Sequence, residues 1–373
     1  MNKSTLLVLA LAMLVPTVAL ADGVTVGGDL RLRWDYSGPE TNASSNSSSA
    51  VTNIDLGAAI NDNVSFAVSL RNDFAFGVPS GPGVSPALQV QEAYASVGDL
   101  GSASGMLAGW SLELGRMNNP DGGRIINSDD WAQDAGPANN DGYHLASDSC
   151  MGGIGVDVWY FGGGSSPAGA ADSMLGAAFD LGDMAGGFAD IDVAYWSSSA
   201  ATDTSNVGIN INNIASENLA GVDLDVTYAT RDNDTADDGT LTGISLGYAM
   251  EGFDLSFSNT IADADWDAFS AAAHGTNGIA DMNVGTNAAG ADVDNTTIGA
   301  SFSPMDGVTA SVDFITLAQD SSGDDIGTEV DVVLGWECGS DVHMTIGYGS
   351  FSADDASALE DSDYFYLGTG WNF

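Results

Sequence analysis

Cationic side chains are almost missing from this sequence. Its 373 residues include seven Lys and Arg against 52 Asp and Glu, which gives a formal net charge of −45. Lys3 is the one lysine. Nucleic acids and anionic lipid surfaces are bound through cationic patches, so the composition excludes both as partners. Adaptation to a saline habitat and a specific function of the charge both explain this acidity, and the sequence leaves the two open.

Cysteine and long apolar runs are also scarce. Cys150 and Cys338 are too few for a disulfide framework, and we expect two free thiols. After Ala21 no apolar run is long enough for a transmembrane helix. Aromatic and β-branched residues are nevertheless too frequent for a disordered chain. The 48 glycines with only 9 prolines are typical of many short strands and turns.

The sequence contains no recognisable catalytic or metal-binding motif. His144, His274 and His343 lie far apart, and neither HExxH nor a phosphate-binding loop occurs. The acidic segments Asp232–Gly239 and Ala262–Asp267 match calcium-binding loops only weakly, and we interpret them as solvated loops. We therefore predict no enzyme, no cofactor and no metal site.

The first 21 residues have the pattern of a secretory signal peptide. Lys3 provides the positive charge, Leu6–Val15 the apolar stretch, and Ala19–Ala21 a small-x-small cleavage pattern. The apolar stretch is too short to span a bilayer as a helix. We expect residues 22–373 to form the mature protein as a single domain.

Both ends of the mature chain alternate between apolar and polar side chains. In Val24–Tyr36 one face is apolar, whereas the other face is mostly charged. A strand with lipid on one side and water on the other requires this pattern. The last strand, Asp363–Phe373, also alternates and resembles the C-terminal strand of bacterial outer-membrane β-barrels. This resemblance implies that the barrel-assembly machinery recognises Phe373.

The same alternation predicts about eighteen strands, and sixteen remain an alternative because Asp141–Ser147 and Asn206–Ala215 are weak. Short and long connections alternate, as in barrels with short periplasmic turns and long extracellular loops. We therefore predict an all-β fold, a transmembrane antiparallel up-and-down β-barrel. Besides the strands named above, the predicted strands are Ile54–Ile60, Val64–Phe74, Leu88–Val97, Met106–Gly115, Ile154–Phe161, Met174–Leu181, Phe188–Trp196, Val222–Thr230, Thr240–Tyr248, Phe253–Ile261, Thr296–Ser303, Val308–Leu317, Thr328–Trp336 and Val342–Phe351.

Aromatic residues give a second signal. They end the strands before the long loops and also the strands before the short turns, as the two interfacial girdles of a membrane barrel require. The girdle candidates are Trp34, Tyr36, Phe74, Phe76, Tyr160, Phe161, Tyr195, Trp196, Tyr228, Tyr248, Phe302, Trp336, Tyr348, Phe351 and Phe373.

The polar faces of the strands are the candidate pore lining. The arginines on these faces either form a field that selects solutes or pair with neighbouring aspartates, and both readings stay open. The long connection Met117–Asn140 is a candidate infolded constriction, with an ordinary surface loop as the alternative. The candidate pore-lining and constriction residues are Arg31, Arg33, Arg71, Arg116, Arg124, Asp29, Asp73, Glu92, Glu113, Asp129 and Asp130. The other inward positions are mainly acidic, which favours cations.

Part of the chain also resembles a known family. The first strand and the segment around residues 114–143 are similar to motifs of the alginate-export family of outer-membrane barrels. The resemblance implies an eighteen-stranded barrel that passes polyuronate or other hydrophilic solutes. A polyanion exporter should have a cationic lumen, so we adopt the fold and the porin role without the alginate substrate. The motif residues are Gly28–Trp34, Leu114–Arg116, Gly123–Ile126, Asp130, Trp131 and Asp141–Tyr143.

These observations predict a porin of the bacterial outer membrane. It would form a passive, water-filled, acidic and cation-preferring channel for small hydrophilic solutes or cations. Outer-membrane lipid would surround it, and the sequence is compatible with a homo-oligomer. Two alternatives remain: a secreted acidic β-rich adhesin or Ca²⁺-dependent surface binding protein, and a structural outer-membrane barrel plugged by its own loops.

Overall fold

The computed structural model describes most of the chain after residue 23. The described residues are 24–39, 44–75, 88–118, 139–150, 153–162, 173–181, 189–199, 203–214, 222–233, 237–266, 292–339, 341–355, 357 and 359–373. The expected signal peptide lies outside these residues. Within them, no helix is long and apolar enough to cross a membrane.

Eighteen β-strands make up nearly all of the described structure. They are β1 Val24–Pro39, β2 Ser45–Asn61, β3 Val64–Ala75, β4 Gln89–Val97, β5 Ser111–Asn118, β6 Asn139–Cys150, β7 Ile154–Gly162, β8 Ser173–Asp180, β9 Asp190–Ser199, β10 Asp203–Asn212, β11 Val222–Asn233, β12 Gly239–Met250, β13 Phe253–Ala262, β14 Val293–Met305, β15 Val308–Ala318, β16 Asp325–Glu337, β17 Val342–Ala353 and β18 Ser362–Asn372.

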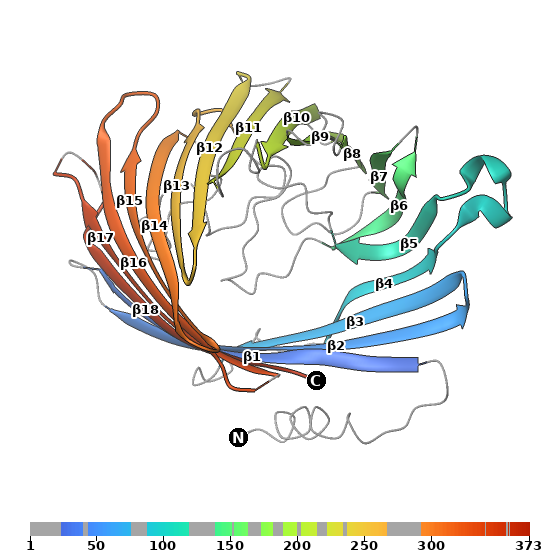
Figure 1. Cartoon of the computed structure of the whole chain (residues 1–373), viewed down its shortest axis with the longest axis horizontal. Coiled ribbons are helices and arrows are strands. Elements are labelled where there is room, and N and C mark those ends of the chain that lie inside the picture. The colour runs from blue at the N-terminus through green and yellow to red at the C-terminus, as the bar shows by residue number, and fades with distance from the viewer. Residues whose placement is uncertain are drawn as a thin grey trace.

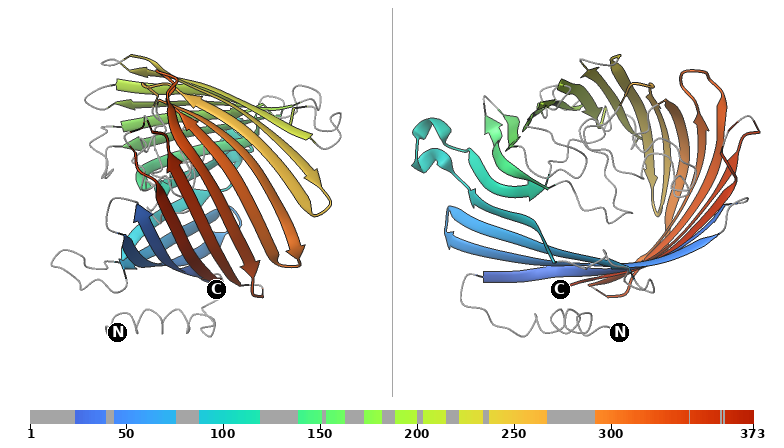
Figure 2. Two further views of the ribbon diagram at one scale, coloured as in Figure 1. Left: turned by 90° about the vertical axis from the view of Figure 1, so that its left-hand side faces the viewer. Right: turned by 180° about the vertical axis from the view of Figure 1, so that it is seen from behind.

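The strands form one closed ring. Each strand pairs in antiparallel fashion with its sequence neighbours, and β1 pairs with β18 from Asp29–Asn372 to Pro39–Ser362. Phe373 and Gly28 exchange two backbone hydrogen bonds of 3.0 Å at this seam. Figure 1 shows the ring, in which β1–β3 lie opposite β9–β12, and Figure 2 shows the inclined strands from the side. The predicted all-β barrel is confirmed.

All eighteen predicted strands are present, including the two weak ones, β6 and β10. Two boundaries differ most from the prediction. The expected loop Ser37–Ala50 is mostly strand, because its serines and asparagines continue the ladder between β1 and β2 as far as Ser37–Ser45. The expected strand Met106–Gly115 begins only at Ser111, and the preceding residues form two short 3-10 turns, Leu100–Ser102 and Gly105–Leu107.

These two turns lie in the connection between β4 and β5, which is held by polar contacts rather than by an apolar core. The Asp99 carboxylate accepts hydrogen bonds from the Gly101 and Gly109 N–H groups. The Asn63 side chain donates to the Asp99 carbonyl and accepts from the Asp99 N–H. The connection between β4 and β5 is therefore anchored to the β2–β3 turn at the same end of the barrel.

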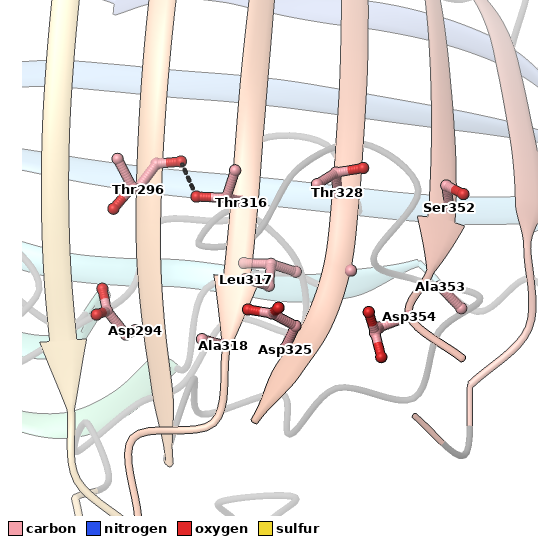
Figure 3. A pocket seen from close by; sticks show the side chains of 11 residues that line it. Asp294, Thr296, Thr316, Leu317, Ala318, Asp325, Thr328, Ser352, Ala353 and Asp354 are labelled. Carbon is pink, nitrogen blue, oxygen red and sulfur yellow. Dashed lines mark hydrogen bonds between the residues drawn. The ribbon is translucent and has the colours of Figure 1, made fainter. Parts of the chain in front are cut away.

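The outer wall is apolar across the middle of the barrel and polar near the long loops. On β14–β16, Ile298, Phe314 and Val330 stand side by side and are 40–56% exposed. The next row towards the long loops is hydroxylic, and the row after it is acidic. The hydroxylic row consists of Thr296, Thr316, Thr328 and Ser352. The acidic row consists of Asp294 and Asp325, with Asp354 close by. Both rows line a pocket on the outer wall (Figure 3). This change marks where the apolar band ends.

The girdle prediction holds for only part of its residues. Trp34, Tyr160, Tyr228 and Tyr348 are exposed on the outer wall near the long loops, and Tyr248 and Phe302 are exposed nearer the short turns. By contrast, Phe161, Trp196 and Phe351 are at most 2% exposed and point inwards. The prediction was wrong for these three because side chains an odd number of positions apart on one strand face opposite sides, so two aromatics such as Tyr348 and Phe351 cannot both face outwards.

A charge on the apolar band should destabilise the barrel. Ile298→Arg is expected to lower the free energy of unfolding in lipid vesicles by about 2–4 kcal/mol, because it places a guanidinium against hydrocarbon. Thr297→Arg is the control, since Thr297 faces inwards on the same strand. Urea unfolding of the two refolded variants measures the difference, and equal losses would contradict the assigned faces.

Candidate functional site: the inner wall of the barrel

The arginines of β1 pair with acidic neighbours on the same inner face. The Arg31 guanidinium lies 2.8 Å from the Asp29 carboxylate, and Arg33 forms the equivalent contact with Asp35. Asn53 on β2 also donates to Asp29 at 2.9 Å. The sequence left two roles open for these arginines, and the structure shows that Arg31 and Arg33 pair with neighbouring aspartates.

Arg33 also joins the two strands of the seam. Its Nη2 lies 2.9 Å from the Tyr364 hydroxyl, which in turn donates to Asp35. The guanidinium carbon lies 4.5 Å from the centre of the Tyr366 ring. We call Arg33, Asp35, Tyr364 and Tyr366 the seam cluster. Opposite it, on the outer face, the Trp34 and Phe365 rings meet edge to face at 5.7 Å, so side chains connect β1 to β18 on both faces.

A second polar group lies on β5–β7. The two ring nitrogens of His144 lie 3.2 Å from Glu113 and 2.8 Å from Asp157. The imidazole stacks on Trp159 with ring centres 5.1 Å apart and planes 12° apart. Two carboxylates and one imidazole thus form a compact contact on the inner wall.

An apolar cluster covers much of the inner wall between β5 and β13. Its rings stack, with Trp196 lying 6.0 Å from Trp159 and 6.2 Å from Phe161. Trp266, which follows β13, belongs to the same cluster and is 3% exposed. The sequence predicts a water-filled, acidic lumen, whereas this cluster makes part of the inner wall apolar and buried.

Polar contacts turn the residues after β13 inwards. The Asp263 carboxylate accepts hydrogen bonds from the Thr240 N–H at 2.6 Å and from its hydroxyl at 2.7 Å. The Trp266 N–H donates to the Asp263 carbonyl at 3.1 Å. A Cβ at position 239 would collide with the backbone of Asp265, so glycine is needed there. The segment from Asp263 to Trp266, interpreted above as a solvated loop, instead brings a tryptophan to the interior.

Carboxylates gather on the inner wall of β8–β11. Phe179 on β8 points outwards, which places Asp180 on the inner face opposite Asp192 of β9. Asn212 donates to Asp192 and Asn213 donates to Asp190, each at 2.9 Å. The sequence has no Lys or Arg between Arg124 and Arg231. We call the inward-facing carboxylates of β8–β11 the acidic band. Its members are Asp180, Asp190, Asp192, Asp223 and Asp225.

The remaining predicted site residues do not form one group. Arg71 is 6% exposed and pairs in register with Asn53, and Glu92 pairs with Ser69 on the inner face. Arg116 donates a hydrogen bond of 2.8 Å to Asp141. Both side chains lie on the outer face, where Leu114 and Tyr143 also lie, so Arg116 does not line the pore. The side chain of Asp73 and the whole of Arg124, Asp129 and Asp130 lie outside the described residues, and so does most of the expected constriction Met117–Asn140.

No metal-binding group appears in the part of the chain that the structure describes. There, no three His, Cys, Asp or Glu side chains are placed to hold one ion. Cys338 is a free, exposed thiol, whereas the side chain of Cys150 falls outside the description.

Comparison with solved structures identifies the fold. Pseudomonas aeruginosa OccK11 (OpdR) matches with a TM-score of 0.67 and 12% identity over 95% of this chain and 98% of its own. OccK5 (OpdH) of the same organism matches with a TM-score of 0.67 and 11% identity over 95% and 99% of the two chains. OpdK, an outer-membrane protein crystallised with vanillate, matches with a TM-score of 0.66 and 13% identity over 93% and 98%.

The chain has the fold of a bacterial outer-membrane porin. No protein-family description matches it, and no curated protein does. The resemblance to the alginate-export family therefore stays a prediction. The porin fold means that the apolar outer wall faces lipid and that the seam cluster and the acidic band lie on the luminal side.

The seam cluster should stabilise the porin fold. Tyr364→Phe removes the hydroxyl that contacts both Arg33 and Asp35, and we expect a loss of about 1–3 kcal/mol in the free energy of unfolding. Tyr348→Phe is the matched control, because its hydroxyl bonds to Asp363 on the exposed outer wall and water can replace that bond. Thermal gel shifts of the two refolded variants measure the loss of stability in each. Equal losses would contradict a stabilising role of the seam cluster.

Asp292 connects two loops at the long-loop end of the barrel. Its carboxylate accepts hydrogen bonds from the Gln319 amide and from the Ser321 N–H and hydroxyl. Desolvation raises its pKa, but these hydrogen bonds outweigh that effect, so the pKa of Asp292 lies below its usual range. The carboxylate therefore holds the connection between β15 and β16 against the start of β14.

The order of this connection should depend on pH. Because the pKa of Asp292 is lower in the folded protein, its contribution is fully present above the unfolded pKa of about 3.9 and is lost as the pH falls through the folded value. Amide exchange at Ser321, corrected for its intrinsic rate, should accelerate over that range. Asp292→Asn should remove the pH dependence, and a wild-type rate independent of pH would contradict the assignment.

Proposed function

We propose that the protein is a passive porin of the bacterial outer membrane with a preference for cations. The acidic band carries this proposal, because carboxylates along a low-dielectric wall attract cations and repel anions. The paired arginines of β1 support it, since Asp29 and Asp35 offset their charge locally. Small hydrophilic solutes would pass by diffusion, without a cofactor or a chemical step.

The proposed solutes differ from the one in the comparison structure. Vanillate is a carboxylate, and its passage would be favoured by luminal cations that are not balanced by acidic groups. In this chain the sequence between Arg124 and Arg231 has no Lys or Arg at all. We therefore do not transfer vanillate or alginate to this protein.

The proposal includes the export and assembly of the chain. Residues 1–21 would direct secretion, and residues 22–373 would form the single barrel domain. Recognition of Phe373 by the barrel-assembly machinery is also part of the proposal, and it rests on the resemblance of the last strand to those of outer-membrane barrels. A homo-oligomer in the membrane remains part of the proposal. A secreted adhesin receives no support from a closed barrel with an apolar outer wall.

One observation favours a second function, a barrel closed by its own interior. The apolar cluster with Trp266 lies inside the ring and excludes water from that part of the wall. Single-channel conductance separates the two functions. A porin gives steady open currents in wild-type protein, whereas a closed barrel gives none.

Cation preference should depend on the acidic band. In a planar bilayer with a KCl gradient, the wild-type reversal potential should have the sign of potassium permeation. The triple variant D190N/D192N/D223N should move it towards equal permeability of the two ions. The variant D294N/D325N/D354N removes the same charge from the outer wall and should change it less. Anion preference of the wild-type channel would contradict the proposal.

A further inference from the structure

A polar pocket lies on the luminal wall of β10–β13. Its volume is about 310 Å³, at the small end of the range for ligand pockets. Asn210, Asp225 and Thr227 line it from one side, and Ser245 and Ser258 from the other. It is separate from the seam cluster and shares only Asp225 with the acidic band.

The strand register arranges the pocket in two rows. Asn210, Thr227, Gly243 and Thr260 are consecutive partners across the four strands. Asp225, Ser245 and Ser258 form the adjacent row. Neighbouring strands are about 4.8 Å apart, so each row presents its groups at a regular spacing along one face. The pocket is therefore a flat array of hydrogen-bonding groups on a rigid wall.

The chemistry of the lining selects among ligand classes. Amides and hydroxyls both donate and accept hydrogen bonds, which suits ligand hydroxyl groups. No Lys, Arg or His lines the pocket, so nothing there attracts an anion. The single carboxylate, Asp225, accepts the Asn213 N–H at 2.9 Å and has further lone pairs that can accept hydrogen bonds from ligand hydroxyl groups. An uncharged, polyhydroxylated molecule matches this set best.

Gly243 provides the room in the middle of the array. A Cβ at this position would be 3.5 Å from the Thr227 Cβ and 3.7 Å from the Thr260 hydroxyl, which are ordinary contacts. A larger side chain would therefore extend into the pocket without displacing the strands. Gly247, four residues further along β12, faces the same way, and its Cβ would be 3.7 Å from the Asp223 Cβ. It lies outside the pocket and provides a matched control.

We propose that this pocket is a binding subsite for an uncharged polyhydroxylated solute of monosaccharide size. The inference rests on the proposed porin function, because the solute reaches the site through the lumen. Weak binding at such a subsite raises the occupancy of the lumen by the preferred solute while still allowing its release.

Glucose is the probe, and two measurements test the site. Binding of radiolabelled glucose to the detergent-solubilised full chain does not require a conducting channel. Interruption of the potassium current by glucose in a planar bilayer does. Gly243→Val should weaken both by about tenfold or more, because its methyl groups occupy the space of the ligand. Gly247→Val should leave both unchanged, and Gly243→Ala is the milder variant if Gly243→Val does not show the gel shift of a folded barrel.

The outcomes separate the subsite from the channel. Glucose binding that Gly243→Val abolishes supports the subsite even if no current flows, and the absence of current then contradicts only the porin function. Open currents that glucose changes no more than its viscosity predicts, together with no glucose binding, overturn the subsite and leave the porin intact. Equal effects of the two valine variants, or interruption by lysine in place of glucose, also overturn it.

Discussion

Backbone hydrogen bonding in hydrocarbon is the constraint on which this structure depends. Each unsatisfied N–H or C=O group in a bilayer costs several kcal/mol, so a sheet that spans the membrane must have no open edge. Here β1 and β18 meet over eleven register pairs, from Asp29–Asn372 to Pro39–Ser362. Phe373 continues this seam through its two bonds with Gly28.

Side chains reinforce the closure that the backbone requires. Bringing together strands from opposite ends of the chain costs loop-closure entropy. The seam cluster on the inner face and the contact between Trp34 and Phe365 on the outer face both add attraction at this junction. The arginines of β1, which the sequence marks as unusual, therefore have a structural role besides any effect on permeating ions.

The interior is divided into regions of different chemistry. The acidic band and the polar pocket occupy β8–β13, while stacked aromatic rings form an apolar cluster on the same arc. Trp266 ties the start of the connection after β13 to this cluster, since Asp263 bends that segment over Gly239. The inner wall therefore combines an apolar region of stacked rings with a separate polar region.

The fold of this chain is shared by proteins with very different sequences. Barrels with 11–13% identity share nearly the whole length of this chain. The wall of a porin barrel requires only that lipid-facing and lumen-facing side chains alternate, and many residue types are suitable on each face. Luminal chemistry is therefore free to diverge, so the vanillate of OpdK cannot be transferred to this acidic chain.

The sequence alone was sufficient for the alternation of faces and the closure of the barrel, because both depend on local periodicity and on the character of the two terminal strands. It predicted about eighteen strands but left sixteen as an alternative, and the structure decided for eighteen. It could not reveal that Arg116 turns outwards with Leu114, that Trp196 stacks on Trp159, or that Trp266 enters the interior. These facts depend on register between distant strands and on loop paths. A shift of one residue reverses the direction of a side chain, so only the tertiary structure decides which groups meet inside the barrel.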